Sequence, residues 1–446
     1  MRKLAFIIII SALTTAVQAQ RTVTLQECIN LATDNNLQLK QGAAGVEFSE
    51  RAANQSRLLL LPNLNLGSSY FWNFGYTIDP VTNLPLANSF QTNGYQATST
   101  MNLFSGGTIS NTIKKTKTDL QVAGMNYKEA LENVQFQVIV AYLAVMFAEE
   151  QLNIANQKIN TTELQLNNSK KLAQAGSIPE GNLLTIEAQL AQDQLSVIQS
   201  QNQLDKTYLD LKLLLQLDPT ENIKITFPDI SKVDNILNAP VPDALTVANY
   251  AIANKASIKK YEYQLLSDGL NKKIAGAAAL PTLSLIGQVG TNYSNATYPP
   301  IITEADPYGT QINNNLSEVV GISLQIPIFN NGQVLLNKQN ADLAIINTQL
   351  NQQIAINTMR QNVTQAINDL KAAIASYAAA EKNLAAAQSA FDFAEKKFNM
   401  GTASSFDYTN AINIKAQAES TLVQAKYDMI FKSKIIDYYL DKTLDF

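Results

Sequence analysis

The sequence contains the same long interval between glycines twice. Gly107 is followed after 69 positions by Gly176, and Gly332 is followed after 69 positions by Gly401. Neither interval contains proline, and the only glycine inside either of them is Gly124. At about 1.5 Å per residue, a helix of this length spans roughly 100 Å. No single globular core is that deep, so we expect a long, thin molecule. Its function is then to span a distance or to form a conduit rather than to catalyse a reaction at its surface.

A seven-residue apolar period inside both intervals predicts helices that pack side by side. In the first interval the large residues are Val138, Val145, Leu152, Ile159 and Leu166, and the small ones are Ala141, Ala148, Ala155, Thr162 and Ser169. In the second, 225 positions on, they are Val363, Leu370, Tyr377, Leu384, Phe391 and Phe398, with Ala366, Ala373, Ala380, Ala387 and Ala394. A strict repeat of seven predicts a left-handed supercoil. Taken alone, this stripe also fits an ordinary dimeric coiled coil.

Two candidate strands precede each long helix. The motif Leu-Pro-x-Leu-x-Leu occurs at 61–66 and again at 280–285. The predicted strands are 64–76 and 95–103 in the first half, then one through Val289 and Tyr293 and one over 320–328 in the second. Period-two alternation is typical of half-buried strands. Thirteen residues extend roughly 43 Å, enough to cross a bilayer even when tilted. The loops between the strands differ in length by six residues between the two halves, which favours exposed tips.

Processing signals indicate export. Residues 1–19 combine two basic residues, the apolar run 4–10 and Val17-Gln18-Ala19, and therefore predict a signal peptide cleaved after Ala19. No other segment approaches 18 consecutive apolar residues, so we expect no transmembrane helix in the mature chain. An exported chain with amphipathic strands belongs, if it is in a membrane, in the Gram-negative outer membrane. Candidate anchors at the membrane interface are Tyr70, Phe71, Trp72, Tyr76, Tyr293 and Tyr298. The alternative is that some of them pack in loops, and the alternation does not assign each one to lipid or lumen.

Composition argues against catalysis. The chain has no histidine, which removes the commonest general base and metal ligand. Its single cysteine, Cys28, excludes an internal disulfide and is interpreted as a helical core residue. Loss of Arg2 and Lys3 takes the formal net charge from −4 to −6, and the absence of a basic run argues against nucleic acid as a partner. We therefore expect no enzyme, no metal site and no cofactor.

Four strands per chain require copies of the chain to close the sheet. An open sheet edge is not tolerated in hydrocarbon, because its backbone groups would have no hydrogen-bond partner. Two copies would give eight strands, whose interior is filled by side chains, whereas three copies give twelve strands and room for a passage. The sequence thus predicts a hollow tube, mostly α with a membrane β-barrel, in which each chain supplies two structural repeats.

The order and spacing of these features resemble the TolC-type outer-membrane efflux proteins. The segments 24–32 and 244–251 are similar to the opening helices of the family, and 102–107 and 327–332 are similar to its strand ends. No one motif is specific, but all of them occur in duplicate, in order and over essentially the whole mature chain. The resemblance predicts one channel protomer over 20–446, made of repeats 24–219 and 243–442 joined by 220–242.

The resemblance also implies partners and a mechanism. It implies a homotrimer with a twelve-stranded barrel, a periplasmic α-barrel of about 100 Å, and an equatorial belt that uses residues 217–242 and those after about Tyr438. Such a channel conducts passively, with substrate delivered by an inner-membrane pump through a periplasmic adaptor. Cargo, pump and adaptor are not specified by the sequence.

The helical turns at the ends of the two intervals are the predicted tip, gate and adaptor-docking site. Its residues are Gly176, Ser177, Pro179, Gly401, Thr402, Ser405, Asp407 and Asn410. Glycine supplies the positive φ that ends a helix, and Pro179 suits the first turn of the return helix. Asp407 falls where the family has a pore-facing aspartate, although an ordinary exposed aspartate is the alternative. Asn410 and Ala403 replace a second aspartate and a constriction arginine, so the family's salt-bridge lock is not expected.

Two other classes stay open. A periplasmic adaptor would be exported and rich in coiled coil, but it should have one helical hairpin flanked by lipoyl-like β segments. A structural periplasmic coiled coil should lack the aromatic, alternating strands.

Overall fold

The computed structural model describes residues 21–75, 77–78, 83, 85–86, 89–176, 178–227, 237, 239–297 and 304–442. The predicted signal peptide, Tyr76, Ser177, Tyr298 and residues 228–236 and 238 of the joining segment lie outside these residues. Contacts divide the chain into two units. The first comprises Met1–Ala43, Asn126–Lys259 and Ile354–Phe446, and the second comprises Ala44–Met125 and Lys260–Gln353.

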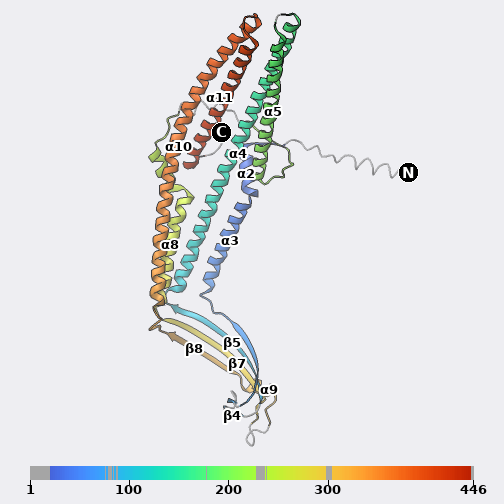
Figure 1. Cartoon of the computed structure of the whole chain (residues 1–446). Helices are drawn as coiled ribbons and strands as arrows, with labels where there is room; N and C mark the ends of the chain where they lie inside the picture. Colours follow the sequence, from blue (N-terminus) through green and yellow to red (C-terminus); the bar gives the residue numbers. More distant parts are fainter. Residues whose placement is uncertain are drawn as a thin grey trace, which may run out of the picture. The chain divides into compact units, whose positions relative to one another are not determined.

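The second unit contains a curved four-stranded antiparallel sheet (Figure 1). Its strands are β2 (Asn65–Asn73), β5 (Phe90–Ser105), β7 (Thr282–Ser294) and β8 (Ser317–Gln325), paired in that order. The register between β5 and β7 shifts once, between Asn102 and Phe104. The predicted strands are therefore confirmed, and β2 and β8 each have one edge without a partner strand in the described chain.

Helices continue from the strands in the same order. The α3 helix (Leu37–Leu58) leads to β2, and β5 leads to α4 (Thr108–Gln174). Likewise α8 (Ala256–Ala277) leads to β7, and β8 leads to α10 (Gln333–Asn399). The short helix α9 (Tyr308–Asn314) and the two-residue strands β3 (Thr77–Ile78) and β4 (Pro85–Leu86) lie in the loops.

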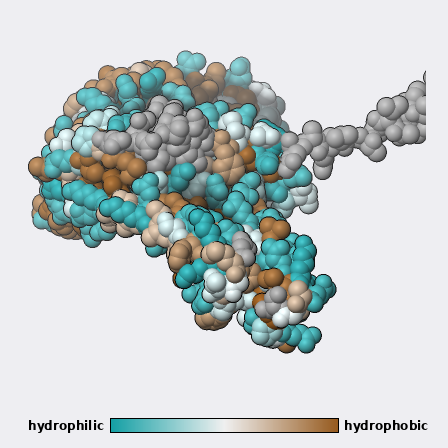
Figure 2. Space-filling model, turned by 90° about the horizontal axis from the view of Figure 1, so that it is seen from above, coloured by the Kyte–Doolittle hydropathy of each residue, from teal (hydrophilic) through white to brown (hydrophobic). Residues whose placement is uncertain are grey.

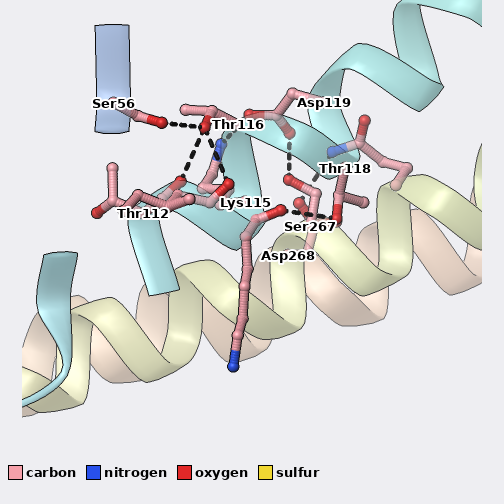
Figure 3. Close-up of polar contacts among 11 residues, drawn as sticks. Ser56, Thr112, Lys115, Thr116, Thr118, Asp119, Ser267 and Asp268 are labelled. Atoms are coloured by element: carbon pink, nitrogen blue, oxygen red, sulfur yellow. Dashed lines mark hydrogen bonds and ion pairs between the residues drawn. The ribbon is translucent and has the colours of Figure 1, made fainter. Parts of the chain in front are cut away.

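Polar contacts join these helices within the second unit (Figure 3). The Thr116 hydroxyl on α4 donates to the Ser56 hydroxyl on α3 at 2.9 Å. Ser267 on α8 donates to Asp119 on α4, and Thr348 on α10 donates to Asp268 on α8 at 2.8 Å. The helices thus repeat the lateral order of the strands, with α3 and α10 at the two edges.

The first unit is helical. The long helices α4 and α10 are followed by the return helices α5 (Glu180–Leu215) and α11 (Ser405–Tyr439). The unit also contains α2 (Leu25–Asn35), α7 (Ala244–Asn254) and a parallel pair of short strands, β1 (Arg21–Val23) and β6 (Ile223–Ile225). Both α4 and α10 have 67 residues and end just before the predicted glycines. The repeat boundaries themselves stay a prediction.

The seven-residue stripes lie on buried surfaces of these helices. Val138, Val145 and Val363 are fully buried, and all the other stripe residues are buried or half-buried. The core of the first unit also includes Cys28, as the sequence predicts, and Tyr142, whose hydroxyl donates to the Thr226 carbonyl at 2.5 Å. The period of seven therefore marks the packing seams.

Within the described residues, one helix is long and apolar enough to resemble a membrane span. This helix is α4. It supplies Val134, Val138, Ile139 and Met146 to the hydrophobic core of the first unit. Core helices of soluble proteins pass the same test of length and composition, and core packing accounts for the apolar character of this stretch.

Candidate functional site

One face of the four-stranded sheet is mostly apolar, although Ser68, Asn93, Ser99 and Thr291 also lie on it. Residues paired directly across an antiparallel ladder point to the same side, so the register defines each face. This side carries Leu66, Tyr70 and Trp72 of β2, Tyr95, Ala97 and Met101 of β5, Leu283, Leu285, Val289 and Tyr293 of β7, and Val320, Ile322 and Leu324 of β8. Leu66 is 84% exposed and Val320 is 82% exposed. Nothing in the described chain covers most of this surface, so its apolar character calls for an external apolar medium.

The opposite face is mostly polar, with Ile286 and Val319 also on it, and it carries no charge in the described strands. Its residues include Ser69 and Phe71 of β2, Gln96 and Thr98 of β5, Gln288 and Asn292 of β7, and Ser317 and Ser323 of β8. Among the four strands the one charged residue is Glu318, which lies near the start of β8 and pairs with Val289 on the apolar face. The sheet therefore has two faces of different character, one mostly apolar and one mostly polar and uncharged.

The register separates the predicted interfacial aromatics. Tyr70 and Trp72 lie on the apolar face with their ring centroids 5.4 Å apart, edge to face. Tyr293 lies on the same face, 5.0 Å from the ring of Tyr308 on α9. Phe71 points to the polar face instead, because it is one residue from both Tyr70 and Trp72 in a strand of period two. It therefore cannot share their surroundings.

Tyr308 also contacts Tyr95 on the apolar face. The hydroxyl of Tyr308 donates to that of Tyr95 at 2.9 Å. Tyr95 is next to Thr291 in the ladder, and the hydroxyl of Thr291 donates to the Ile312 carbonyl of the α9 segment at 2.6 Å. The α9 segment thus packs on the apolar face at one end of the sheet. The alternation around Tyr95 was visible in the sequence, but the position of Tyr308 was not.

The helical tips end as the sequence predicts. Gly176 has a φ of 71° and Gly401 a φ of 72°. At the second tip the Gly401 amide donates to the Phe398 carbonyl and the Thr402 amide to the Lys397 carbonyl, both at 2.9 Å. This pair of bonds is the Schellman motif, in which a left-handed glycine satisfies the last carbonyls of a helix.

The two return helices start differently. Ser404 caps α11: the Asp407 amide donates to its hydroxyl oxygen at 3.1 Å, and the hydroxyl donates to the Asp407 carboxylate at 2.7 Å. Pro179 holds the equivalent position before α5, with a ψ of 146° and no side-chain cap. The expectation that Pro179 lies in the first turn is therefore wrong by one residue, because its extended ψ precedes the helix.

The other predicted tip residues differ in exposure. Asp407 and Asn410 are exposed, and the exposed Asp407 carboxylate is held by Ser404. Ser405 is buried, and its hydroxyl has no hydrogen-bond partner among the described residues. Beside it, Tyr408 stacks on Phe398 with centroids 4.8 Å apart and on Phe391 at 5.8 Å. Sequence reasoning placed these phenylalanines on the packing stripe but overlooked Tyr408, whose pKa is raised to about 12, chiefly by burial and then by Glu395.

A buried carboxylate joins the two helices of the first hairpin. Asp193 on α5 is 1% exposed. Its oxygens accept hydrogen bonds from Thr162 at 2.7 Å and Gln189 at 2.8 Å, and they pair with the Lys158 ammonium at 2.8 Å. Buried charge is costly unless it is paired and hydrogen-bonded, and Asp193 satisfies that condition with one cation and two neutral donors.

The seam between α4 and α11 changes character along its length. Near the tip it is polar: the Gln165 amide donates to the Thr409 hydroxyl at 3.1 Å, and the Gln165 Oε1 atom is buried without a partner in the described chain. Further along, Ser420 donates to Gln151 at 2.8 Å. Beyond that, Phe147 packs against Tyr427 with centroids 6.2 Å apart. The α4–α11 seam is therefore polar towards the tip and apolar further from it.

The end of α11 is fixed by a buried lysine. The Lys255 ammonium, whose side chain is 3% exposed, lies 2.6 Å from the Asp441 carboxylate and 3.5 Å from that of Glu132. It also lies 4.0 Å from the centroid of the Tyr438 ring. The residues after Tyr438 were predicted to join an equatorial belt, and these contacts connect them to α4 and to the α7–α8 junction.

The described residues contain no group of three or more Cys, Asp or Glu side chains able to hold a metal ion. Cys28 is buried, and desolvation raises the pKa of its thiol to about 12. A thiol in this state is a poor nucleophile at neutral pH.

The sequences of several outer-membrane proteins align with nearly the whole chain. The outer membrane protein TolC of Vibrio cholerae is 23% identical over 437 residues, covering 96% of this chain and 93% of the relative. The TolC of Escherichia coli K12 is 23% identical over 438 residues, covering 96% and 84%. Among solved structures, the Campylobacter jejuni CmeC outer membrane channel superposes with a TM-score of 0.76 at 17% identity, covering 93% of this chain and 85% of that one. CusC gives a TM-score of 0.73 at 17% identity, with coverages of 94% and 92%.

These structural likenesses show the fold, and the family follows from a family model. The model described as "Outer membrane efflux protein" matches residues 28–215 and 247–433, which is most of the chain. This family is a class of channels and not of enzymes. With its two-faced sheet and paired long hairpins, the chain belongs to the outer membrane efflux protein family and is a Gram-negative outer-membrane protein that extends into the periplasm.

Proposed function

We propose that this chain forms the outer-membrane duct of a tripartite efflux or secretion system and conducts substrate passively. The observation that carries the proposal is the four-stranded sheet, with one exposed apolar face, one uncharged polar face and two unpaired edges. An apolar face suits lipid, a polar face suits a water-filled bore, and unpaired edges suit closure by copies of the chain.

The height of the apolar face fits an outer membrane. Leu283 and Tyr293 are ten residues apart on β7, or about 33 Å along a strand at about 3.3 Å per residue. A strand tilt of about 40° reduces this to about 25 Å, the usual height of the lipid-facing band in such barrels. Tyr70, Trp72, Tyr95, Tyr293 and Tyr308 would lie at one boundary of that band, where tyrosine and tryptophan are favoured.

Three copies would close the sheet into twelve strands by joining β8 of one copy to β2 of the next. The helices at the same edges support this closure, because both expose apolar side chains. Phe48 on α3 is 75% exposed, and Leu343 and Leu350 on α10 are 63% and 58% exposed. On the face seen in Figure 2, hydrophobic patches also lie between hydrophilic residues. Surfaces of this kind are typical of interfaces.

The tips would form the periplasmic entrance, where a periplasmic adaptor docks and an inner-membrane pump delivers the substrate. Gly176, Gly401 and Thr402 shape the turns, and Asp407 of three copies would form a ring of carboxylates. The polar α4–α11 seam supports movement there, because exchanging buried polar contacts for water costs less than exposing an apolar seam. Adaptor contact would then move the hairpins apart from the tip.

Extraction and sizing test the duct. We expect the full chain to partition with outer membranes, to require detergent, and to give a particle of about three times the 48.8 kDa chain. The particle should conduct ions in a planar bilayer. A soluble or monomeric product would contradict the proposal. It would instead support a periplasmic adaptor or a structural coiled coil, which the family match does not favour.

A further inference from the structure

The uncharged face of the sheet contains a hollow of about 430 Å³. Two rows of directly paired residues form its floor. One row is Gly67, Gln96, Gly290 and Ser317, and the next is Ser69, Gly94 and Asn292. Gln288 and Asn315 also line it, as does the intervening ladder row of Ser68, Tyr95 and Thr291, whose side chains belong to the other face. A cavity of this size lies within the range that binds small ligands.

Glycine makes the hollow by alternating with polar residues. Gln96 has Gly67 on one side and Gly290 on the other, so no neighbouring side chain fills the space around its amide. Gly94 lies between Ser69 and Asn292, and a Cβ atom there would come within 3.0 Å of the Ser69 hydroxyl oxygen. Glycine weakens a strand interior, and it commonly marks a place where another molecule approaches the backbone.

The polar groups that line the hollow are free to bind. The side chains of Gln96, Gln288 and Asn292 make no hydrogen bond to another described residue, and each amide offers two donors and one acceptor oxygen. Ser317 donates to the Gly290 carbonyl at 3.2 Å, which leaves its own lone pairs unused. The lining thus presents several neutral hydrogen-bonding groups within a small area.

An aromatic ring lies on the same face beside these groups. Phe71 is two residues beyond Ser69 in β2 and is 59% exposed. An aromatic face next to neutral amides suits a ligand with apolar C–H surfaces and many hydroxyls. A charged ligand is not favoured, because the described strands offer no ionic partner on this face.

We propose that the hollow is a binding site for a neutral, hydroxyl-rich chain such as an oligosaccharide. Gln96, Gln288 and Asn292 would bind its hydroxyls, and Phe71 would pack against a sugar ring. The inference rests on the proposed function in one respect: the polar face must line the bore, so that a passing molecule meets the site. Neutral, glycan-like molecules would then be a class of cargo that binds briefly in the duct while passing through it.

Ion-current recordings of the purified full chain in a planar bilayer test the site, with maltohexaose as the probe. We expect maltohexaose to interrupt the current, and polyethylene glycol of matched size to do so only briefly. Phe71→Ala and Gln96→Ala should each shorten the interruptions by about five-fold, as expected for one lost contact. Gln325→Ala is the control, because it removes the same kind of amide from the same face outside the hollow.

The outcomes separate the two proposals. If the unaltered chain conducts no current at all, the duct proposal is overturned. The sugar site alone would be overturned if conductance is normal but maltohexaose interrupts the current no longer than polyethylene glycol does. It would also be overturned if the interruptions in Phe71→Ala and Gln96→Ala are as long as in the unaltered chain. Interruptions shortened equally by Gln325→Ala would also overturn it, because the effect would then belong to the face as a whole.

Discussion

At the scale of single residues, Asp407 has a structural partner and a proposed pore role. Its carboxylate accepts the Ser404 hydroxyl, so it helps to start α11. It is also exposed, and three copies around a threefold axis would place like charges near one another and favour a bound cation. The two roles are separable, because asparagine keeps an oxygen for Ser404 but removes the charge.

Replacing Asp407 with asparagine tests the pore charge. We expect Asp407→Asn to leave the folded channel intact and to raise the concentration of a trivalent cation needed to block the current by at least about ten-fold. Planar bilayer recordings measure this. Asp205→Asn is the matched control, because this exposed aspartate also accepts from one side chain, that of Gln201, but lies 25 residues into α5 and so away from the tip. If the same concentration of trivalent cation blocks Asp407→Asn and the unaltered channel, Asp407 has only its capping role.

The buried thiol gives a second prediction at this scale. Because burial raises the pKa of Cys28 to about 12, almost none of it is thiolate at pH 8. We expect a maleimide to label the native protein at least about a thousand-fold more slowly than the denatured protein. Labelling at comparable rates would show that α2 does not stay packed in the core of the first unit.

At the scale of elements, the hairpin α4–α5 depends on a charge inside its seam. Asp193 is held by Lys158, Thr162 and Gln189. Removing one member of such a cluster leaves the others buried without a partner. The cluster lies on the half of the hairpin nearer the tip, so it should also control how readily that end opens.

We expect Asp193→Ala to lower the free energy of unfolding by about 3 kcal/mol and to speed proteolysis near the tip. Denaturant titration and limited proteolysis measure the two effects. Asp205→Ala serves as the comparison, because this exposed aspartate on the same helix accepts only from Gln201, one turn away. If the two variants behave alike, the cluster does not stabilise the hairpin.

Sequence reasoning located elements better than it located neighbours. The positive-φ glycines and the period of seven predict both 67-residue helices, because these signals are local. The period of two already places Phe71 opposite Tyr70 and Trp72, but the β5 and β7 residues that share its face follow only from the strand register, which the long loop between β2 and β5 does not fix. The cap at Ser404 is local, because Ser404 lies three residues before Asp407, and that spacing is a readable sign of a helix start. The packing of α9 and the pairing of Asp193 with Lys158 and Thr162 depend on contacts between distant segments. No spacing in the sequence reports such contacts.

At the scale of the whole molecule, placement in the membrane depends on the two faces of the sheet. Neighbouring residues of β8 provide a matched test: Ile322 lies on the apolar face and Ser323 on the polar one. We expect Ile322→Lys to weaken folding into lipid vesicles by about 2–4 kcal/mol, because it places a charge in hydrocarbon. Ser323→Lys should fold nearly normally.

Urea titration of the vesicle-folded protein compares these two variants. The opposite result, with Ser323→Lys the more damaging, would mean that the lipid and bore faces have been exchanged. That result would also remove the sugar site from the bore, whereas equal damage would show that neither face meets lipid.

The equal lengths of α4 and α10 limit how such a molecule can change in size. Seven residues of helix add about 10.5 Å and restore every seam to its former register, whereas most other insertions rotate the apolar stripe away from its neighbours. The same change must also be made in α5 and α11, or the hairpins no longer match. A longer or shorter version can therefore arise only by whole heptads applied to four helices together, so the length of the helical hairpins can change only in steps of about 10.5 Å.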